Sequence, residues 1–214
     1  MIEACDREVQ TRLGSFASTI DPAQHPLPGA KSRRKTLEIT PGFDLRTELS
    51  RILGTDLTQV PGLNTPSVFT LFAELGVDLL SFPAGSHFAS WLGVCPDSRI
   101  SGGKVLSVRT RHVKHRVAQA LRLAAQSLSR SQSVLGAFFR RMRAKLGAPE
   151  AITATAHKLA RIIYYHLITT HEPYDETRVA KAEQEHQRRT ESRVRAQARA
   201  LGFQLVPVTE GSAS

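Results

Sequence analysis

Three apolar stripes with helical spacing constrain the fold of this chain more than any other feature of its sequence. Within each stripe, apolar side chains recur at intervals of three and four residues, which predicts a helix with one buried face. The stripes consist of Val113, Val117, Ala120, Leu121, Ala124 and Leu128; Leu135, Phe138, Phe139, Met142 and Leu146; and Ile152, Ala156, Leu159, Ile162, Ile163 and Leu167. Because the same region shows no strand-like alternation, the sequence predicts a mainly α fold.

Two shorter helices are predicted upstream, one over residues 44–53 and one starting at the N-cap Thr65. The segment Val60-Pro61-Gly62-Leu63 between them is typical of the turn of a helix–hairpin–helix. In that motif, backbone N–H groups at a helix N-terminus hold a DNA phosphate without reading bases. Gly62 is therefore a candidate phosphate-binding residue, although the usual pattern has a second glycine where Asn64 stands. The alternative is a helical hairpin that only packs.

The segments outside this region differ from it in apolar pattern, proline content and charge, and we expect the chain to have four parts in all. Residues 1–20 look like the end of a coiled-coil helix, because apolar side chains form a heptad-like seam. Residues 21–43 form a Pro-rich basic linker, residues 44–172 a helical domain, and residues 173–214 a charged C-terminal helix and tail. The seam of the first helix predicts a homo-oligomer, and its members are Ile2, Cys5, Val9, Leu13 and Phe16.

The charge of the chain is concentrated in one segment. Residues 99–145 contain twelve Lys or Arg and no Asp or Glu, against a net charge of +10 for the whole chain. A solvated helix face usually mixes both signs, so a purely cationic stretch favours a nucleic-acid partner. The candidate phosphate-binding residues on this segment are Lys104, Arg109, Arg111, Lys114, Arg116, Arg140, Arg141 and Arg143. The alternative is a solvated face without a ligand.

A membrane partner is disfavoured, since Trp91 is the single tryptophan and no apolar run approaches the roughly 18 residues of a membrane span. The N-terminus has no apolar signal core. Two cysteines, 90 positions apart, exclude a disulfide framework and fit a reducing compartment, so we expect a cytoplasmic protein. No metal-ligand spacing occurs, and we expect neither a metal site nor a cofactor within this chain.

The loop expected from Cys95 to Gly103 ends in a set of residues suited to phosphoryl transfer, Ser101-Gly102-Gly103-Lys104. The serine would attack a backbone phosphorus, and the glycine N–H groups and the lysine would stabilise the charged oxygens. The set is not a P-loop, because Ser98 stands where that motif needs a glycine. Alone, a Ser-Gly-Gly-Lys sequence is more often a flexible turn. Ser98 is a competing nucleophile, and the neighbouring histidines that could serve as bases are His87, His112 and His115.

Four separated blocks together resemble a known family. They are Leu57-Thr-Gln-Val-Pro-Gly-Leu, Phe88-Ala-Ser-Trp-Leu-Gly-Val-Cys-Pro, Ile100-Ser-Gly-Gly-Lys and Thr155-Ala-His-Lys-Leu-Ala-Arg-Ile-Ile-Tyr-Tyr. In this order and spacing, they resemble the C-terminal serine domain of bacterial insertion-sequence transposases of the bridge-RNA-guided recombinase class. The resemblance covers roughly residues 1–208, and it implies that the helical domain over 44–172 is a serine transposase domain.

The resemblance also implies a mechanism and its requirements. Ser101 matches the nucleophilic serine of the family, which forms a covalent phosphoserine link to a cleaved DNA strand. The family has an N-terminal RNase-H-like domain whose acidic residues hold magnesium, and it uses a guide RNA. We expect that acidic domain to be missing here, so magnesium is expected only with it, and we expect the chain alone to be inactive or nearly so. The alternatives are a non-catalytic DNA- or RNA-binding fragment that interferes with a full-length relative, and a nucleoid-like basic protein.

Overall fold

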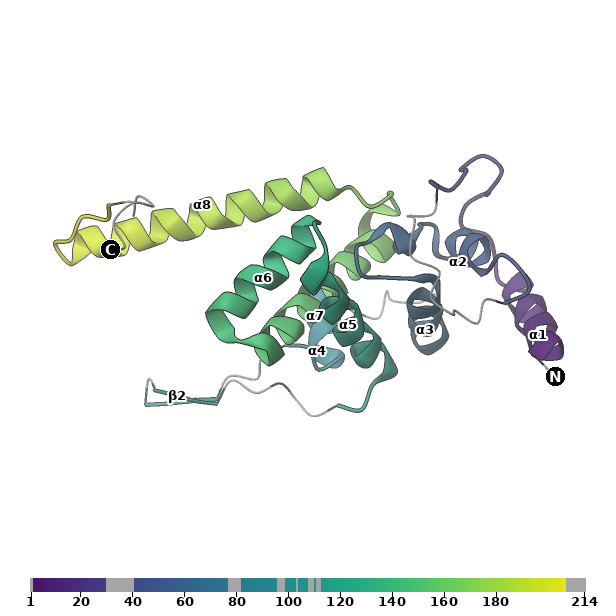
Figure 1. Cartoon of the computed structure of the whole chain (residues 1–214), viewed down its shortest axis with the longest axis horizontal. Helices are drawn as coiled ribbons and strands as arrows, with labels where there is room; N and C mark the ends of the chain where they lie inside the picture. Colours follow the sequence, from purple (N-terminus) through teal and green to yellow (C-terminus); the bar gives the residue numbers. More distant parts are fainter. Residues whose placement is uncertain are drawn as a thin grey trace. The chain divides into compact units, whose positions relative to one another are not determined.

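Helices dominate the computed structural model, which describes residues 2–29, 41–76, 82–95, 99–102, 104–107, 110 and 113–206 (Figure 1). The mainly α prediction is therefore confirmed. The chain divides into two compact units, Met1–Tyr174 and Asp175–Ser214. The expected division into four parts is not tested by this result and stays a prediction.

The centre of the first unit is the helix α7 (Ala148–Tyr164). It lies against α4 (Gly85–Trp91), α5 (Arg116–Ser127) and α6 (Val134–Leu146), as Figure 1 shows. The buried faces of α5, α6 and α7 follow the three apolar stripes, and Leu121, Leu135 and Leu159 are all fully buried. The prediction is wrong for Leu146, which ends α6 and is exposed. After α7 the chain continues as a π-helix, η3 (Tyr165–Thr170), and turns at His171, which has φ 50°.

A second group of helices packs beside this centre. It comprises α2 (Leu45–Leu53), the 3₁₀ turn η1 (Leu57–Gln59) and α3 (Thr65–Leu75), and α3 contacts α5. Another 3₁₀ turn, η2 (Leu128–Arg130), continues α5. The predicted start of α3 is wrong by one residue, because Asn64 and not Thr65 is the N-cap. The Asn64 side chain accepts a hydrogen bond from the Ser67 N–H, which Thr65 inside the helix cannot do.

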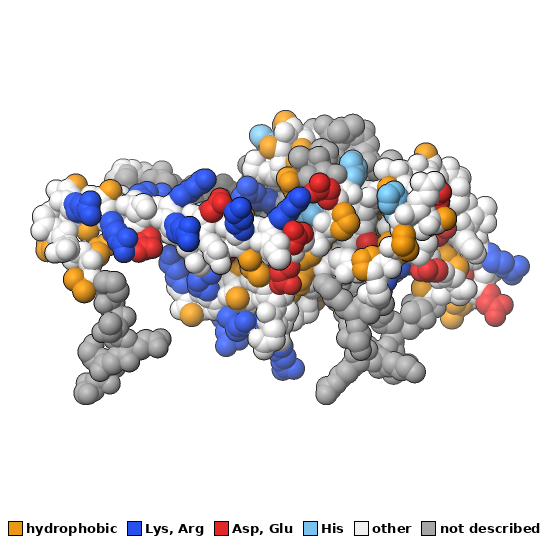
Figure 2. Space-filling view, turned by 90° about the horizontal axis from the view of Figure 1, so that it is seen from above, with side chains coloured by type: hydrophobic (Ala, Val, Ile, Leu, Met, Phe, Trp, Pro, Cys, Tyr) orange, Lys and Arg blue, Asp and Glu red, His pale blue; other side chains and the backbone are white. Residues whose placement is uncertain are grey.

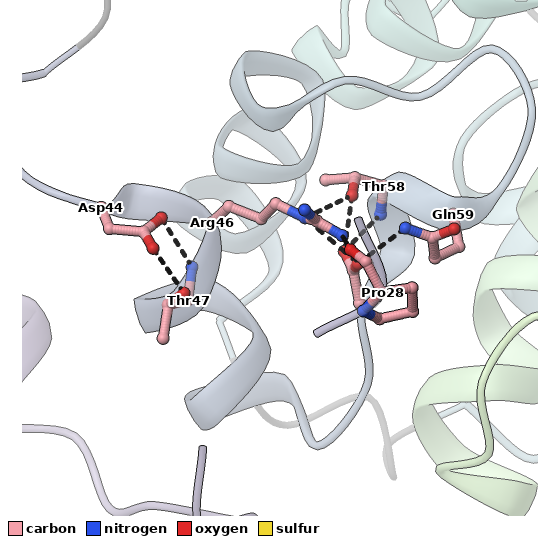
Figure 3. Close-up of polar contacts among 7 residues, drawn as sticks. Pro28, Asp44, Arg46, Thr47, Thr58 and Gln59 are labelled. Atoms are coloured by element: carbon pink, nitrogen blue, oxygen red, sulfur yellow. Dashed lines mark hydrogen bonds and ion pairs between the residues drawn. The ribbon is translucent and has the colours of Figure 1, made fainter. Parts of the chain in front are cut away.

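A buried ion pair ties α2 to the turn that follows it (Figure 3). The Arg46 guanidinium lies 2.5 Å from the Asp56 carboxylate and also donates to the Pro28 carbonyl. Asp56 accepts further hydrogen bonds from the side chains of Thr58 and Gln59. Burial acts to raise the pKa of Asp56, but these hydrogen bonds and the Arg46 charge outweigh it and hold the pKa below its ordinary value.

The first helix, α1 (Ile2–Gly14), docks on α2 through its C-terminal end. Leu13 is buried, and the Arg51 guanidinium donates to the carbonyls of Leu13 and Phe16. The apolar seam predicted for this helix is therefore divided: its end packs within the chain, whereas Ile2 and Cys5 are exposed.

A short antiparallel hairpin lies between α4 and α5, formed by β1 (Arg99–Ser101) and β2 (Lys104–Ser107). The sequence predicted a loop from Cys95 to Gly103, and this is wrong for β1. Strands of three and four residues are too short to produce a visible alternation.

The second unit is described by itself. It contains α8 (Glu176–Ala200), which begins at the N-cap Asp175 and has no buried residue. Figure 2 shows Asp and Glu side chains among the Lys and Arg side chains along this helix. The charged C-terminal helix expected from the sequence is present.

Removal of Arg46, the partner of Asp56, should destabilise the first unit. Arg46→Met leaves the buried Asp56 carboxylate without its counter-ion, and we expect a loss of about 3 kcal/mol in the free energy of unfolding. Arg12→Met is the matched control, because its pair with Glu8 is largely exposed; we expect a change of about 0.5 kcal/mol or less there. Urea unfolding of both variants measures the difference, and equal losses would contradict the role of the buried pair.

The same pair predicts a pH dependence. Because the folded pKa of Asp56 is lowered, the unfolded chain takes up this proton at a higher pH than the folded chain does. The stabilisation is therefore present above the unfolded pKa and is lost as the pH falls below about 4. In Asp56→Asn, unfolding between about pH 5 and pH 2.5 should depend less steeply on pH than in the natural chain.

Candidate nucleic-acid interface

Ser101 lies at the end of β1, where the hairpin turns. Its Cα pairs with that of Lys104 across the two strands. Gly102 follows with φ 55°, a left-handed conformation that suits a tight two-residue turn. Ser101 and Gly102 are exposed, and a Cβ on Gly102 would meet no atom within 4 Å. Gly103 and the side chain of Lys104 lie outside the described residues. The Ser-Gly-Gly-Lys set is thus a hairpin turn that presents a serine to solvent.

The surroundings of Ser101 contain no activating group that the structure describes. No described residue forms a hydrogen bond with its hydroxyl, and Ser98 and His112 lie outside the described residues. His115 has a different role, since its Nδ1 accepts from the Val117 N–H at 3.2 Å and caps α5. His87 is exposed on α4. Among the described residues, no three His, Cys, Asp or Glu are grouped so that they could hold a metal ion.

The cations around the start of α5 are exposed to solvent. Lys114 precedes the helix, and Arg116 begins it. Arg116 lies 3.4 Å from Glu74 of α3, but its side chain is 81% exposed, so this pair contributes little stability and leaves the guanidinium accessible. The predicted phosphate-binding residues Arg109 and Arg111 lie outside the described residues.

The cations of α6 differ from one another in their contacts. Arg140 donates to the Ser131 carbonyl at 2.6 Å. Arg141 lies over the Phe138 ring at 5.4 Å from its centroid, and Lys158 of α7 lies over the same ring at 4.3 Å. Arg143 is exposed. The structure thus adds Lys158 to the candidate surface. The sequence did not indicate it, because Lys158 lies outside residues 99–145, the acid-free segment, although it belongs to the block that starts at Thr155.

Gly62 occupies a turn that is partly packed. Its φ is 94°, and a Cβ there would lie 2.9 Å from the Ala124 carbonyl oxygen of α5. The neighbouring Leu63 N–H donates to the Val60 carbonyl within the turn. One side of the predicted phosphate-binding turn therefore faces the protein, as the packing alternative expects. Phosphate binding by Gly62 itself stays a prediction.

Comparison with known families gives one match. Residues 54–140 match the model of the family described as Transposase IS116/IS110/IS902 family. The matched residues include the Gly62 turn, α3, α4, the hairpin with Ser101, α5 and the first half of α6. They are less than half of the chain, and they support an insertion-sequence transposase. No match is found among curated proteins. The described part of the chain also has no helix of the length and apolar character that a membrane crossing needs.

The acid-free segment should govern binding to DNA and its salt dependence. If six or more of its cations meet phosphates, the affinity should fall by roughly 10³-fold between about 50 and 200 mM salt. Each phosphate contact removed should lower the slope of log affinity against log salt by about one. Arg130 and Arg143 are exposed members of this segment. We therefore expect the double variant Arg130→Glu/Arg143→Glu to weaken binding to all sequences and to flatten the slope, as fluorescence anisotropy with a labelled duplex would measure.

Arg12→Glu serves as the matched control for these charge reversals. Arg12 is exposed, as Arg130 and Arg143 are, but it lies on α1, outside the acid-free segment. An equal loss of affinity in this variant would mean that only the net charge matters, and binding that does not respond to salt would contradict the interface altogether.

Proposed function

We propose that this chain takes part in DNA transposition, binding DNA through the acid-free segment and attacking a backbone phosphorus with Ser101. The observation that carries the proposal is the transposase family match over residues 54–140, which contains the hairpin that exposes Ser101. An exposed serine at a hairpin tip is accessible to a phosphodiester, and the hairpin belongs to the same acid-free segment as the candidate phosphate-binding cations. The sequence resemblance to serine transposases points to the same residue.

The proposed step exchanges one phosphodiester for another. The Ser101 Oγ forms a bond to phosphorus, and the bond from phosphorus to the leaving sugar oxygen breaks. The serine hydroxyl loses its proton to a base, and the leaving oxygen gains one, so the step needs no oxidant or reductant. Because a serine hydroxyl is weakly nucleophilic, the reaction requires an activating group.

The activating group is proposed to come from the acidic RNase-H-like domain that the resemblance implies. The described residues of this chain offer no cluster that fits magnesium, so no part of the step is assigned to a metal held by them. The contribution of this chain is the nucleophile and the cationic surface that positions the DNA. A guide RNA is part of the same proposal, since the resemblance implies one.

A covalent adduct tests the role of Ser101. The full chain is incubated with DNA, magnesium, a guide RNA and an acidic domain from a related transposase, and adducts that survive denaturation are measured on gels. We expect an adduct with the natural chain and none with Ser101→Ala, whereas DNA binding should be unchanged, because the variant loses one hydroxyl. Loss of the adduct in Ser98→Ala but not in Ser101→Ala would assign the nucleophile to Ser98.

A second candidate function is non-catalytic binding of DNA or RNA that interferes with a full-length relative. The observation that favours it is the lack of an activating partner for Ser101 among the described residues. In that case the Ser101→Ala chain would inhibit transposition by a relative as well as the natural chain does. A requirement of Ser101 for adduct formation would exclude this alternative.

We also propose that the chain associates through the exposed part of its first helix. Leu13 cannot test this, because its side chain is buried within the chain and Leu13→Asp should unfold the region. Ile2→Asp changes only an exposed member of the seam. Sedimentation should show an oligomer that Ile2→Asp dissociates; a monomer at tens of micromolar, unaffected by the substitution, would contradict the proposal.

A further inference from the structure

Trp91 is the single tryptophan of the chain, and 46% of it is exposed. It forms the last residue of α4, whose neighbouring side chains Phe88, Ala89 and Leu92 are fully buried. The exposure of Trp91 therefore does not come from a poorly packed helix. A large apolar ring is held at the surface by a helix that is otherwise anchored in the core.

Two aromatic neighbours hold the Trp91 ring in place. Phe82 lies 5.3 Å away between ring centroids at an interplanar angle of 53°, and His115 lies 4.5 Å away at 70°. Both neighbours are themselves fixed: the Phe82 carbonyl accepts from the Tyr164 hydroxyl at 2.6 Å, and His115 accepts from the Val117 N–H. Because both contacts are inclined, neither neighbour is stacked in parallel on the indole.

A rigid, exposed aromatic ring is the kind of surface on which an unpaired nucleobase stacks. Phe138 is a useful contrast within the same unit, because cationic groups of Arg141 and Lys158 already lie over its ring. Among the described residues, the aromatic neighbours of Trp91 are inclined to its ring, so its exposed surface is suited to a flat ligand.

The charges around Trp91 fit the phosphates that flank a stacked base. Lys114 and Arg116 adjoin His115 in sequence, and both are exposed. Glu74 is the acid that pairs with Arg116. The pair is largely exposed, so a phosphate can compete with Glu74 for the Arg116 guanidinium. The site thus combines an aromatic platform with two exposed cations that flank its His115 neighbour in the sequence.

We propose that Trp91 stacks an unpaired DNA base, with Lys114 and Arg116 on the adjoining phosphates. A base inside a duplex is stacked on both faces and cannot reach the ring, so the ligand is a single-stranded stretch of DNA. The choice of DNA follows from the transposase family match. This inference rests on the proposed function and adds to it the form of DNA that the chain binds.

The fluorescence of Trp91 tests stacking directly, because no other tryptophan contributes. Titration of the full chain with an oligo(dT) strand should quench this fluorescence, and a blunt duplex of equal length should leave it almost unchanged. The same titration with an oligo(U) strand tests whether the chain binds RNA at this site instead. Equal quenching by the duplex, or quenching by the RNA strand alone, would overturn the proposal.

Substitutions separate stacking from charge attraction. Trp91→Leu should lower the affinity for a labelled oligo(dT) strand by about 5- to 100-fold, whereas Trp91→Phe, which keeps an aromatic ring, should retain most of it. Tyr165→Leu is the matched control, since Tyr165 is similarly exposed on η3. Circular dichroism and thermal unfolding confirm that each variant folds.

The outcomes distinguish this inference from the proposed function. If the natural chain binds neither duplex nor single-stranded DNA, the proposed function fails. If it binds both, and Trp91→Leu binds single strands as well as the natural chain does, only the stacking site fails.

Discussion

The packing of α7 is the constraint on which the first unit depends. Ala151, Ala156 and Ala160 are fully buried on this helix, and their small side chains let the surrounding helices approach closely. Leu159 and Ile163 fill the remaining space and are also fully buried. Because α4, α5 and α6 all contact the same helix, a change in its apolar surface would disturb the elements that carry Trp91, Arg116 and the cations of α6.

This packing also fixes the two ends of the segment that contains the hairpin. The segment leaves α4 and returns at the N-terminus of α5, and both helices lie against α7. The ring contact between Trp91 and His115 joins these two ends directly. The proposed nucleophile and the proposed stacking site therefore share one anchor, so a DNA strand held at Trp91 would be held at the base of the segment that presents Ser101.

The cations of the acid-free segment have unequal roles once the chain is folded. Arg140 and Arg122 donate to backbone carbonyls, so part of their function is to satisfy the ends of neighbouring turns. Lys114, Arg130 and Arg143 are exposed. Hydrogen bonds to carbonyls do not remove positive charge, and all of these groups contribute to the potential that attracts a polyanion. The exposed ones are the better candidates for direct phosphate contact.

The helices and the positive sign of the surface charge can be predicted from the amino-acid sequence alone. Periodic apolar residues such as Leu121, Leu135 and Leu159 report local geometry, because one helical face must be buried wherever the partner comes from. The contacts between distant residues depend on the tertiary structure: Gly62 packs on Ala124, and Trp91 contacts His115. It also placed Lys158 beside Arg141 over one ring. These contacts join separate elements, and no local periodicity specifies how helices cross or which exposed side chains they bring together.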